Sequence, residues 1–323
     1  IGDYAYVGTG FGVDLAEYTD FKKYNLNDGT WTDVPDNFPG KGRHGAVAFV
    51  AEKGGKTYAY VGLGYISANQ IQGSDGTAEI RAKEYLKDNS WTKIEDFPGE
   101  ARRDAVAFTL DNYGYVGTGR ADKALLFKDF YCFDPETETW NTEELGFKGD
   151  QRYGASAFVV NGAAYVCLGA KGSGYAQDVI KCTPLGGGKV AWDNMQALTD
   201  KPGVKQDKDY DRIPRAFAVS FISNKGNDGE SYAYIATGTG NNPSTVWKYN
   251  HKKDQWHQME DLAPSAGNVV GAVSFVADGY GYYTTGGTSI DPIDANSSSS
   301  TRYFTNSTWR FIPDVKETRR NDY

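Results

Sequence analysis

One short phrase recurs six times along this chain: an apolar, aromatic-rich run that ends in glycine. Its copies occupy residues 4–10, 58–64, 113–119, 163–169, 232–238 and 280–286. The central tyrosines stand at positions 6, 60, 115, 165, 234 and 282, which gives a period of 48 to 69 residues. Because this period is too long for most helical repeats and suits one four-stranded sheet per repeat, the chain is predicted to form a series of small sheets.

A second recurring run precedes the phrase; it begins with arginine and ends at phenylalanine. It occupies residues 43–49, 102–108, 152–158 and 215–221, and a further copy at 269–275 has valine in place of arginine. Alanines such as Ala46 and Ala105 in this run favour a strand with other backbones packed closely around it. The glycine-ended phrase is almost continuously apolar, so it is predicted to be a strand buried on both faces.

Two aromatic positions complete each repeat. A third strand is indicated by the aromatic residues Tyr24, Tyr85, Phe133, Tyr249 and Phe311, and a fourth by Trp31, Trp91, Trp140, Trp192 and Trp256. Turn residues such as Asn27 and Gly29 lie between the two strands. We expect these single tryptophans to wedge between adjacent sheets.

The segment Phe-Asp-Pro-Glu-Thr-Glu-Thr-Trp at 133–140 closely matches the signature between the third and fourth strands of kelch repeats. With its arginine-led first strands, the chain resembles the kelch family of β-propellers over nearly its whole length. The resemblance implies an all-β, six-bladed kelch-like β-propeller with four-stranded antiparallel blades. It implies one domain over 1–323, with blades at about 1–37, 38–97, 98–147, 148–198, 211–262 and 266–323. Only Gly286 and Gly287 form the glycine pair usual after a kelch second strand, so we interpret the chain as a divergent, bacterial branch.

The first and last repeats are incomplete. Ile1 aligns with Leu110, so the first blade starts just before its second strand and lacks its first. Residues 318–323 align with a fourth strand that lacks its tryptophan. Because propellers avoid open edges by joining their first and last blades, we expect an upstream segment to supply the missing strand.

Composition restricts the partners and the compartment. The net charge of −8 argues against a nucleic-acid partner, and no apolar run reaches the roughly 18 residues of a transmembrane helix. Cys132, Cys167 and Cys182 have no metal-type spacing and are predicted to be buried free thiols, with a Cys167–Cys182 bridge left open. The acidic composition, rich in tyrosine and glycine, resembles exported bacterial kelch-like proteins. That resemblance favours the periplasm or cell surface, with a lipid tether upstream of Ile1.

The longest connections and the leading arginines are predicted to share one face. Strands alternate in direction, so fourth-to-first and second-to-third connections emerge together; the longest of them are residues 65–78, 195–214 and 287–306. Guanidinium groups on this face suit an anionic ligand. The candidate ligand-binding residues are Arg43, His44, Arg102, Arg152, Arg215, Tyr65 and Arg120. The structural alternative is that each repeated arginine bonds neighbouring loop carbonyls or an aspartate.

No metal or cofactor site is predicted. The three histidines, His44, His251 and His257, are too few for a copper or zinc cluster, which disfavours a copper-radical oxidase of the galactose-oxidase type. The run 207–211 has aspartate at alternate positions but lacks the glycine and glutamate of a calcium loop, so we interpret it as a charged surface loop. No nucleophile–base pair can be nominated.

Three functions remain open. The main hypothesis is a non-catalytic binding scaffold whose arginine-lined, loop-rich face takes a protein, peptide or glycan ligand. The alternative is a sugar-acid isomerase acting on an anionic carbohydrate, as the resemblance to kelch-type sialic acid mutarotases implies, with Asp104 as the candidate base beside the arginines. The third is a structural domain of a larger surface assembly.

Overall fold

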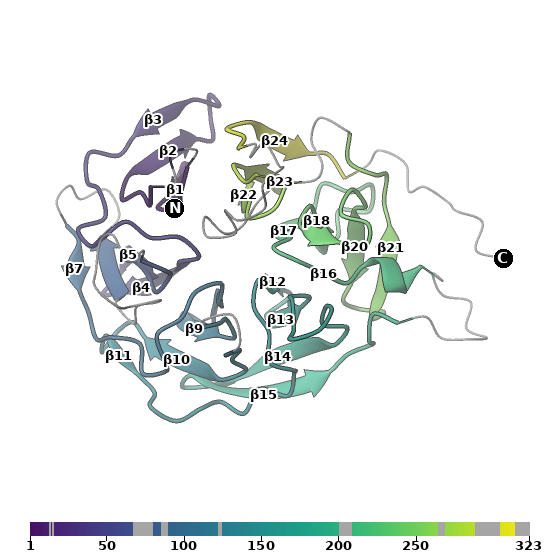
Figure 1. The fold of residues 1–323 in the computed structure, drawn as a ribbon, viewed down its shortest axis with the longest axis horizontal. Coiled ribbons are helices and arrows are strands. Elements are labelled where there is room, and N and C mark those ends of the chain that lie inside the picture. Colours follow the sequence, from purple (N-terminus) through teal and green to yellow (C-terminus); the bar gives the residue numbers. More distant parts are fainter. Residues whose placement is uncertain are drawn as a thin grey trace. The chain divides into compact units, whose positions relative to one another are not determined.

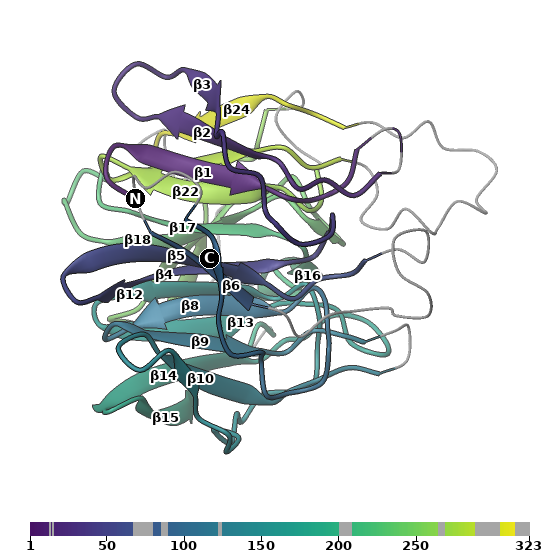
Figure 2. The same cartoon turned by 90° about the vertical axis from the view of Figure 1, so that its left-hand side faces the viewer.

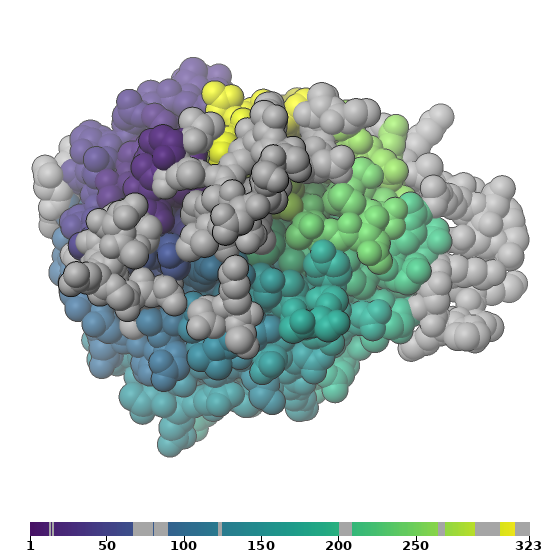
Figure 3. Space-filling model, in the orientation of Figure 1, coloured from purple at the N-terminus to yellow at the C-terminus, as the bar shows by residue number. Residues whose placement is uncertain are grey.

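The computed structural model describes residues 1–12, 14, 16–66, 80–84, 90–121, 125–199, 209–263, 269–287 and 304–313. Contacts group the chain into two compact units. Unit 1 comprises Ile1–Phe147, Gln151–Tyr153 and Pro184–Ala191, and unit 2 comprises Lys148–Asp150, Gly154–Thr183 and Trp192–Tyr323. Most of unit 1 is the purple to blue part of Figure 3. In the described ranges the only helix is a 3-10 turn at Tyr210–Arg212, and none there is long and apolar enough to cross a membrane.

Three antiparallel sheets form the first part of the chain (Figures 1 and 2). The first sheet pairs β1 (Tyr4–Gly8), β2 (Phe21–Asn25) and β3 (Trp31–Asp33). The second pairs β4 (Val47–Lys53), β5 (Lys56–Gly62), β6 (Ile80–Glu84) and β7 (Thr92–Lys93). The third pairs β8 (Val106–Leu110), β9 (Tyr113–Gly117), β10 (Phe130–Asp134) and β11 (Thr139–Trp140).

Three more sheets and one two-stranded pair follow. The fourth sheet pairs β12 (Ser156–Val160), β13 (Ala163–Cys167), β14 (Val179–Gly186) and β15 (Lys189–Asn194). The fifth pairs β17 (Val219–Ser223), β18 (Tyr232–Ala236), β20 (Trp247–Asn250) and β21 (Gln255–Gln258), beside the short pair β16 (Arg215–Ala216) and β19 (Thr239–Gly240). The last pairs β22 (Val273–Ala277), β23 (Tyr280–Thr284) and β24 (Thr308–Phe311).

The four-stranded antiparallel sheet is thus the repeating element, as predicted. The count of six such blades is wrong for the described residues, in which four sheets have four strands and the first and last have three. The first sheet has no counterpart of the first strand of the other repeats, as the sequence of that repeat indicated. The strand expected at 318–323 lies outside the described residues, as do the third-strand aromatic Tyr85 and much of the three long connections.

The second strand is almost wholly buried in β9, β13 and β18, as predicted, but only partly buried in β1. In the five repeats with a first strand, the central tyrosine stacks on the phenylalanine of that strand. The ring centroids of Phe49 and Tyr60 are 4.9 Å apart, and those of Phe108 and Tyr115 are 5.3 Å apart. Phe133 of β10 meets Tyr60 edge to face at 4.9 Å, which locks the second and third sheets together. Such aromatic pairs contribute about 0.5–1.5 kcal/mol each beyond their burial.

Trp91 and Trp140 lie between neighbouring sheets, as predicted. Trp140 of β11 donates its indole Nε1–H to the carbonyl oxygen of Glu95, which follows β7, at 3.2 Å. Trp91 packs against Phe21 and Phe38, with ring centroids 5.5 and 5.4 Å away. Each of these two indoles therefore joins its own sheet to the preceding one.

The glycine that ends the phrase ties each sheet to the next repeat. Gly64 donates its N–H to the carbonyl oxygen of Arg102 at 2.8 Å. Equivalent bonds are made by Gly10, Gly119, Gly169 and Gly238. Leu63 and Gly64 both lie in the left-handed region, with φ of 56° and +95°. A Cβ on Gly64 would lie 2.8 Å from the carbonyl oxygen of His44, so the backbones approach too closely for any other residue.

Three glycine-to-alanine variants should separate backbone strain from this close approach. Gly238→Ala combines a φ of +92° with a Cβ 2.5 Å from the Ala216 carbonyl oxygen, and we expect a loss of about 2–5 kcal/mol. Gly10→Ala has the same backbone (φ +96°) with nothing within 4 Å, so about 1–2 kcal/mol is expected. Gly172→Ala has neither feature and should stay within about 0.5 kcal/mol. Urea unfolding measures all three; equal losses for Gly10→Ala and Gly238→Ala would refute the steric role.

The three cysteines are buried thiols outside any disulfide, as predicted. In the β13–β14 pairing Cys167 lies opposite Val179, and Cys182 lies opposite Ala164. The two thiols are therefore three residues apart along the ladder, about 10 Å, which is too far for a bridge. Burial raises the pKa of Cys132 to about 11, so this thiol is unreactive.

Candidate functional site

The four leading arginines are buried, and three of them are bonded to the backbone of their own repeats. Arg43, Arg102, Arg152 and Arg215 are each 0% exposed. In three of them Nη1 donates to the carbonyl oxygen of the residue just before the glycine that ends the phrase: Leu63 at 3.2 Å, Thr118 at 3.1 Å and Thr237 at 3.3 Å. In the same three, Nε donates to the carbonyl oxygen two residues earlier in the chain. Both oxygens of Asp129 also accept from Arg102.

For Arg43, Arg102 and Arg215 this geometry favours the structural alternative over the predicted ligand site. The Arg215 guanidinium donates to the carbonyl oxygens of Arg212, Ile213, Thr237, Pro243 and Thr245, and to the Thr245 hydroxyl. Burial lowers the pKa of Arg215 to about 10, because desolvation outweighs the attraction of Asp261. We therefore assign these three arginines to the fold.

The other predicted residues, His44, Tyr65 and Arg120, come together in unit 1. His44 and Tyr65 form an antiparallel bridge that continues the β4–β5 pairing, with backbone hydrogen bonds of 3.1 and 2.8 Å. Arg103 and Arg120 form the equivalent bridge beyond β8 and β9, with two bonds of 2.9 Å. Asp104 N–H donates to the carbonyl oxygen of Gly45 at 2.9 Å and so joins the two extensions. We call Glu17, His44, Tyr65, Arg103, Asp104, Arg120 and Tyr153 the polar cluster.

Two guanidinium groups of the polar cluster lie over tyrosine rings. Arg120 lies 4.2 Å from the ring centroid of Tyr153, and Arg103 lies 4.8 Å from that of Tyr65. Arg120 Nε donates to Asp104 Oδ2 at 2.7 Å, and Arg103 Nε lies 3.9 Å from the same oxygen. The arginine side chains are only 5% and 8% exposed, so both positive charges are fixed in a weakly solvated place.

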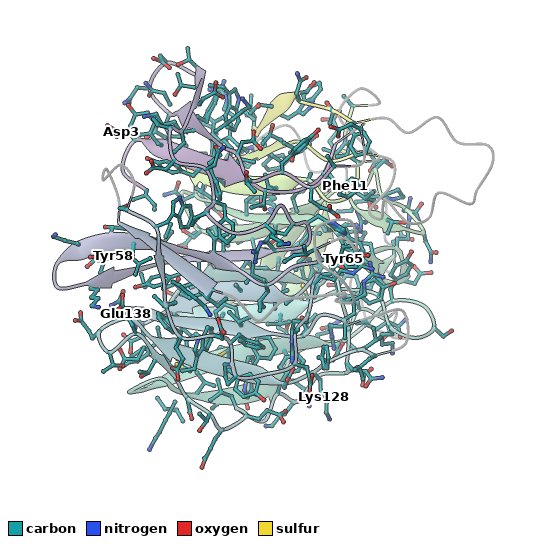
Figure 4. The ribbon with its side chains drawn as sticks, turned by 60° about the vertical axis from the view of Figure 1, so that its left-hand side comes forward. Asp3, Phe11, Tyr58, Tyr65, Lys128 and Glu138 are labelled. Atoms are coloured by element: carbon teal, nitrogen blue, oxygen red, sulfur yellow. The ribbon has the colours of Figure 1, made fainter. Side chains whose placement is uncertain are left out.

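His44 stands at the centre of the polar cluster. Its Nε2 lies 3.0 Å from Arg103 Nη1, and its Nδ1 lies 3.7 Å from Glu17 Oε1. The imidazole is flanked by the rings of Phe11 and Tyr65 at 5.0 and 5.1 Å. Figure 4 shows Phe11 and Tyr65 at one end of the unit 1 strands, whereas Tyr58 lies at the other end. Within unit 1, these second-to-third connections therefore share a face, as expected.

The polar cluster departs from the repeat. Asp104 has a φ of 56° at a position where Gly45, Gly154 and Gly271 have φ of 59° to 68° and Phe217 has 55°. A side chain in this conformation costs about 1–2 kcal/mol, and such strain is concentrated at functional sites. No other repeat has an arginine at either place: the position of Arg103 holds His44, Tyr153, Ala216 and Val270 elsewhere, and that of Arg120 holds Phe11, Tyr65, Ala170, Thr239 and Gly287. The fold does not require the polar residues.

Glu17, Arg103 and Tyr153 were absent from the sequence-based candidates. Arg103 and Tyr153 directly follow leading arginines, and their signal was the variation at that repeat position. Glu17 had no such signal, because it comes from the connection after β1 and meets its neighbours through the Phe11–Glu17 bridge.

The remaining candidates fall elsewhere. His251 and His257 belong to the β20–β21 hairpin of unit 2, where burial lowers the pKa of His251. Asp207 lies outside the described residues, and Asp209 pairs with Arg212 at 3.7 Å. Across the described ranges no three histidine, cysteine or carboxylate side chains gather as metal ligands would.

No family model matches this chain. Its curated relatives include N-acetylneuraminate epimerases from Escherichia coli, 32% identical over 127 residues, and from Shigella boydii, 30% identical over 127 residues. Each match covers 37% of this chain and 32% of the relative, so the chain spans about a third of the length of the curated relatives it matches.

Among solved structures, one described as "Structure of YjhT" superposes with a TM-score of 0.68 at 16% identity. The superposition covers 95% of this chain and 91% of that chain. At this identity the likeness concerns the fold alone. The chain is therefore an all-β propeller with four-stranded antiparallel blades, and part of it is similar in sequence to N-acetylneuraminate epimerases.

Proposed function

We propose that this chain binds an anionic sugar acid at the polar cluster and interconverts its anomers. The observation that carries the proposal is the pair Arg103 and Arg120, which lie opposite each other at positions where no other repeat has an arginine, with Arg103 Nη1 3.0 Å from His44 Nε2. Two guanidinium groups suit a carboxylate through bidentate hydrogen bonds. Similarity to N-acetylneuraminate epimerases supports the substrate class, because N-acetylneuraminate is a carboxylated sugar.

The contacts within the polar cluster suggest a role for each member. Arg103 and Arg120 bind the substrate carboxylate, and the tyrosine rings beneath them hold the guanidinium planes. Asp104, the base suggested by the sequence, accepts a hydrogen bond from Arg120, so we assign it to orienting that guanidinium. His44 is then the group that transfers protons, because an imidazole can both accept and donate a proton near neutral pH.

Anomer exchange of a cyclic sugar acid requires the ring to open and close again. A base removes the proton of the anomeric hydroxyl, whose O–H electron pair forms the carbonyl bond. The bond between the anomeric carbon and the ring oxygen breaks, and the ring oxygen keeps that electron pair and takes the proton. Closure on the other face of the carbonyl reverses these steps. One imidazole can serve as base and then as acid, and no oxidant or co-reactant is needed.

Proton NMR tests the proposal directly. N-acetylneuraminate dissolved as a single anomer should equilibrate faster with the protein than in buffer, with a rate proportional to protein concentration. Lys252→Gln is the control, because it removes one positive charge outside the polar cluster. Lys252 is 57% exposed and pairs with Glu230 in unit 2, so the mutarotation rate of this variant should equal that of the parent. A parent rate equal to the buffer rate would exclude the mutarotase.

A binding scaffold is the second candidate, favoured by the arginine–tyrosine stacks that suit glycan recognition. Calorimetry distinguishes it from an enzyme, since heat of binding without faster anomer exchange would identify a receptor for the sugar acid. We also propose that the chain is a divergent kelch protein with an extracytoplasmic location, supported by the signature at 133–140 and the acidic composition. Recovery of the protein only from the cytoplasm on cell fractionation would contradict that location.

A further inference from the structure

The contacts of His44 determine which of its ring nitrogens carries the proton. Arg103 Nη1 lies 3.0 Å from His44 Nε2, and the two side chains are buried. A guanidinium has only donors, so Nε2 must accept this hydrogen bond. The hydrogen of the neutral imidazole is therefore on Nδ1, which lies 3.7 Å from Glu17 Oε1.

Glu17 is fixed where it can select this tautomer. Its side chain is 2% exposed and that of His44 is 4% exposed, so the carboxylate and the imidazole face each other away from water. The backbone around Glu17 is held by the Phe11–Glu17 bridge and by close contact with Gly42, where a Cβ would lie 2.1 Å from the Glu17 carbonyl oxygen. A carboxylate beside one ring nitrogen is the usual device that sets a histidine tautomer.

We propose that Glu17 is a positioning residue that keeps His44 in its Nδ1–H form, and that Arg103 covers the basic Nε2 until a substrate carboxylate draws the guanidinium away. A charge-assisted hydrogen bond is about twice as strong as one to a neutral acceptor, so a carboxylate competes well with the imidazole for Arg103. The same ligand that fills the site then uncovers its base. The displacement of Arg103 by a substrate carboxylate rests on the proposed function, whereas the assignment of the His44 tautomer does not.

Every proton that moves in the reaction passes between His44 Nε2 and the substrate. Uncovered Nε2 takes the proton of the anomeric hydroxyl, and the resulting imidazolium lies beside the Glu17 carboxylate, which stabilises its charge. Nε2 returns the proton to the ring oxygen as the ring opens. Around this imidazole the charged groups are Glu17 on one side and Arg103, with Asp104 behind it, on the other.

Nitrogen NMR of histidine-labelled protein tests the tautomer without any turnover. The chain has three histidines, and His44→Gln identifies the His44 signals. We expect a protonated Nδ1 and an unprotonated Nε2 in the parent, and a mixture of tautomers in Glu17→Gln, whose amide has nearly the shape of the carboxylate. Glu230→Gln is the control, because Glu230 is in an exposed ion pair, and it should leave the His44 signals unchanged. An Nε2–H tautomer in the parent, or unchanged His44 signals in Glu17→Gln, would overturn the assignment.

Adding N-acetylneuraminate tests the uncovering of the base. The Nε2 signal should shift on binding, and Glu17→Gln should lower the mutarotation kcat about 100-fold with KM almost unchanged. A protein that shows the Nδ1–H tautomer but no mutarotation would refute the proposed function and leave Glu17 as the positioning residue. Mutarotation with no change at Nε2 on saturation with the sugar would overturn the covering role of Arg103.

Discussion

Arg215→Met is expected to unfold unit 2 under conditions in which the parent stays folded. Methionine fills most of the volume of the arginine but cannot donate hydrogen bonds. The variant would leave the buried carbonyl oxygens of Ile213, Thr237 and Thr245 without the donor they have in the parent. Each buried polar group that loses its partner costs about 1–3 kcal/mol, so a loss of about 3–5 kcal/mol is expected. This is a large part of the total stability of an ordinary domain, about 5–15 kcal/mol.

Arg212→Met is the matched control for this prediction. Arg212 lies three residues away, its side chain is 20% exposed, and its bonds to Gln258 and Asn242 are both long, at 3.4 Å. Its removal should cost about 1 kcal/mol or less. Urea unfolding followed by tryptophan fluorescence measures both variants. Equal stabilities of the Arg215→Met and Arg212→Met proteins would show that the guanidinium bonds contribute little to the fold.

The repeated arginines show why sequence reasoning found the fold more easily than the site. A residue that recurs in successive repeats usually makes a contact that the fold of each repeat requires. Arg43, Arg102 and Arg215 make the same contact, since each donates a hydrogen bond to the carbonyl oxygen just before the glycine that ends its phrase. For that reason the structural alternative is favoured over a ligand site at these arginines. Function is better sought where the repeat is broken, as at Asp104.

Part of the polar cluster follows from hairpin geometry that the sequence contains. Asp111 and Asn112, with φ of 52° and 63°, form the two-residue turn between β8 and β9 and fix Leu110 opposite Tyr113. Counting back along the ladder from that pair brings Arg103 opposite Arg120, as the structure has it. The juxtaposition of these two arginines was therefore predictable from the turn and the strand period.

The rest of the polar cluster could not be predicted in this way. Glu17 and His44 belong to different repeats, and no turn or ladder fixes their separation in the sequence. Their approach depends on how the connection after β1 folds back through the Phe11–Glu17 bridge. The contact of Asp104 with Arg120 depends on a left-handed backbone at a residue that has a side chain, which propensity argues against.

The double variant Asp104→Gly with Arg120→Ala is expected to abolish mutarotation and keep the fold. It gives the third sheet the pair that the next repeat already has, Gly154 and Ala170. Either change alone leaves one charge of a buried pair behind, since the Arg120 and Asp104 side chains are 8% and 6% exposed. Removing one partner of such a pair costs about 3–5 kcal/mol. The double variant leaves neither charge and relieves about 1–2 kcal/mol of left-handed strain, which offsets a lost arginine–tyrosine contact of similar size.

The double variant should therefore be more stable than either single variant and within about 1 kcal/mol of the parent, a coupling that a double-mutant cycle in urea measures. Its mutarotation rate should fall at least about 100-fold. Without Arg120 the substrate carboxylate is bound in a different place, so the anomeric hydroxyl is no longer held near His44. Phe217→Gly is the control, since Phe217 has a φ of 55° at the equivalent position of unit 2, and its rate should match that of the parent. A double variant with parental activity would show that the Asp104–Arg120 pair does not serve the reaction. A double variant less stable than both single variants would show that the repeat does not tolerate glycine and alanine there, so that the pair belongs to the fold.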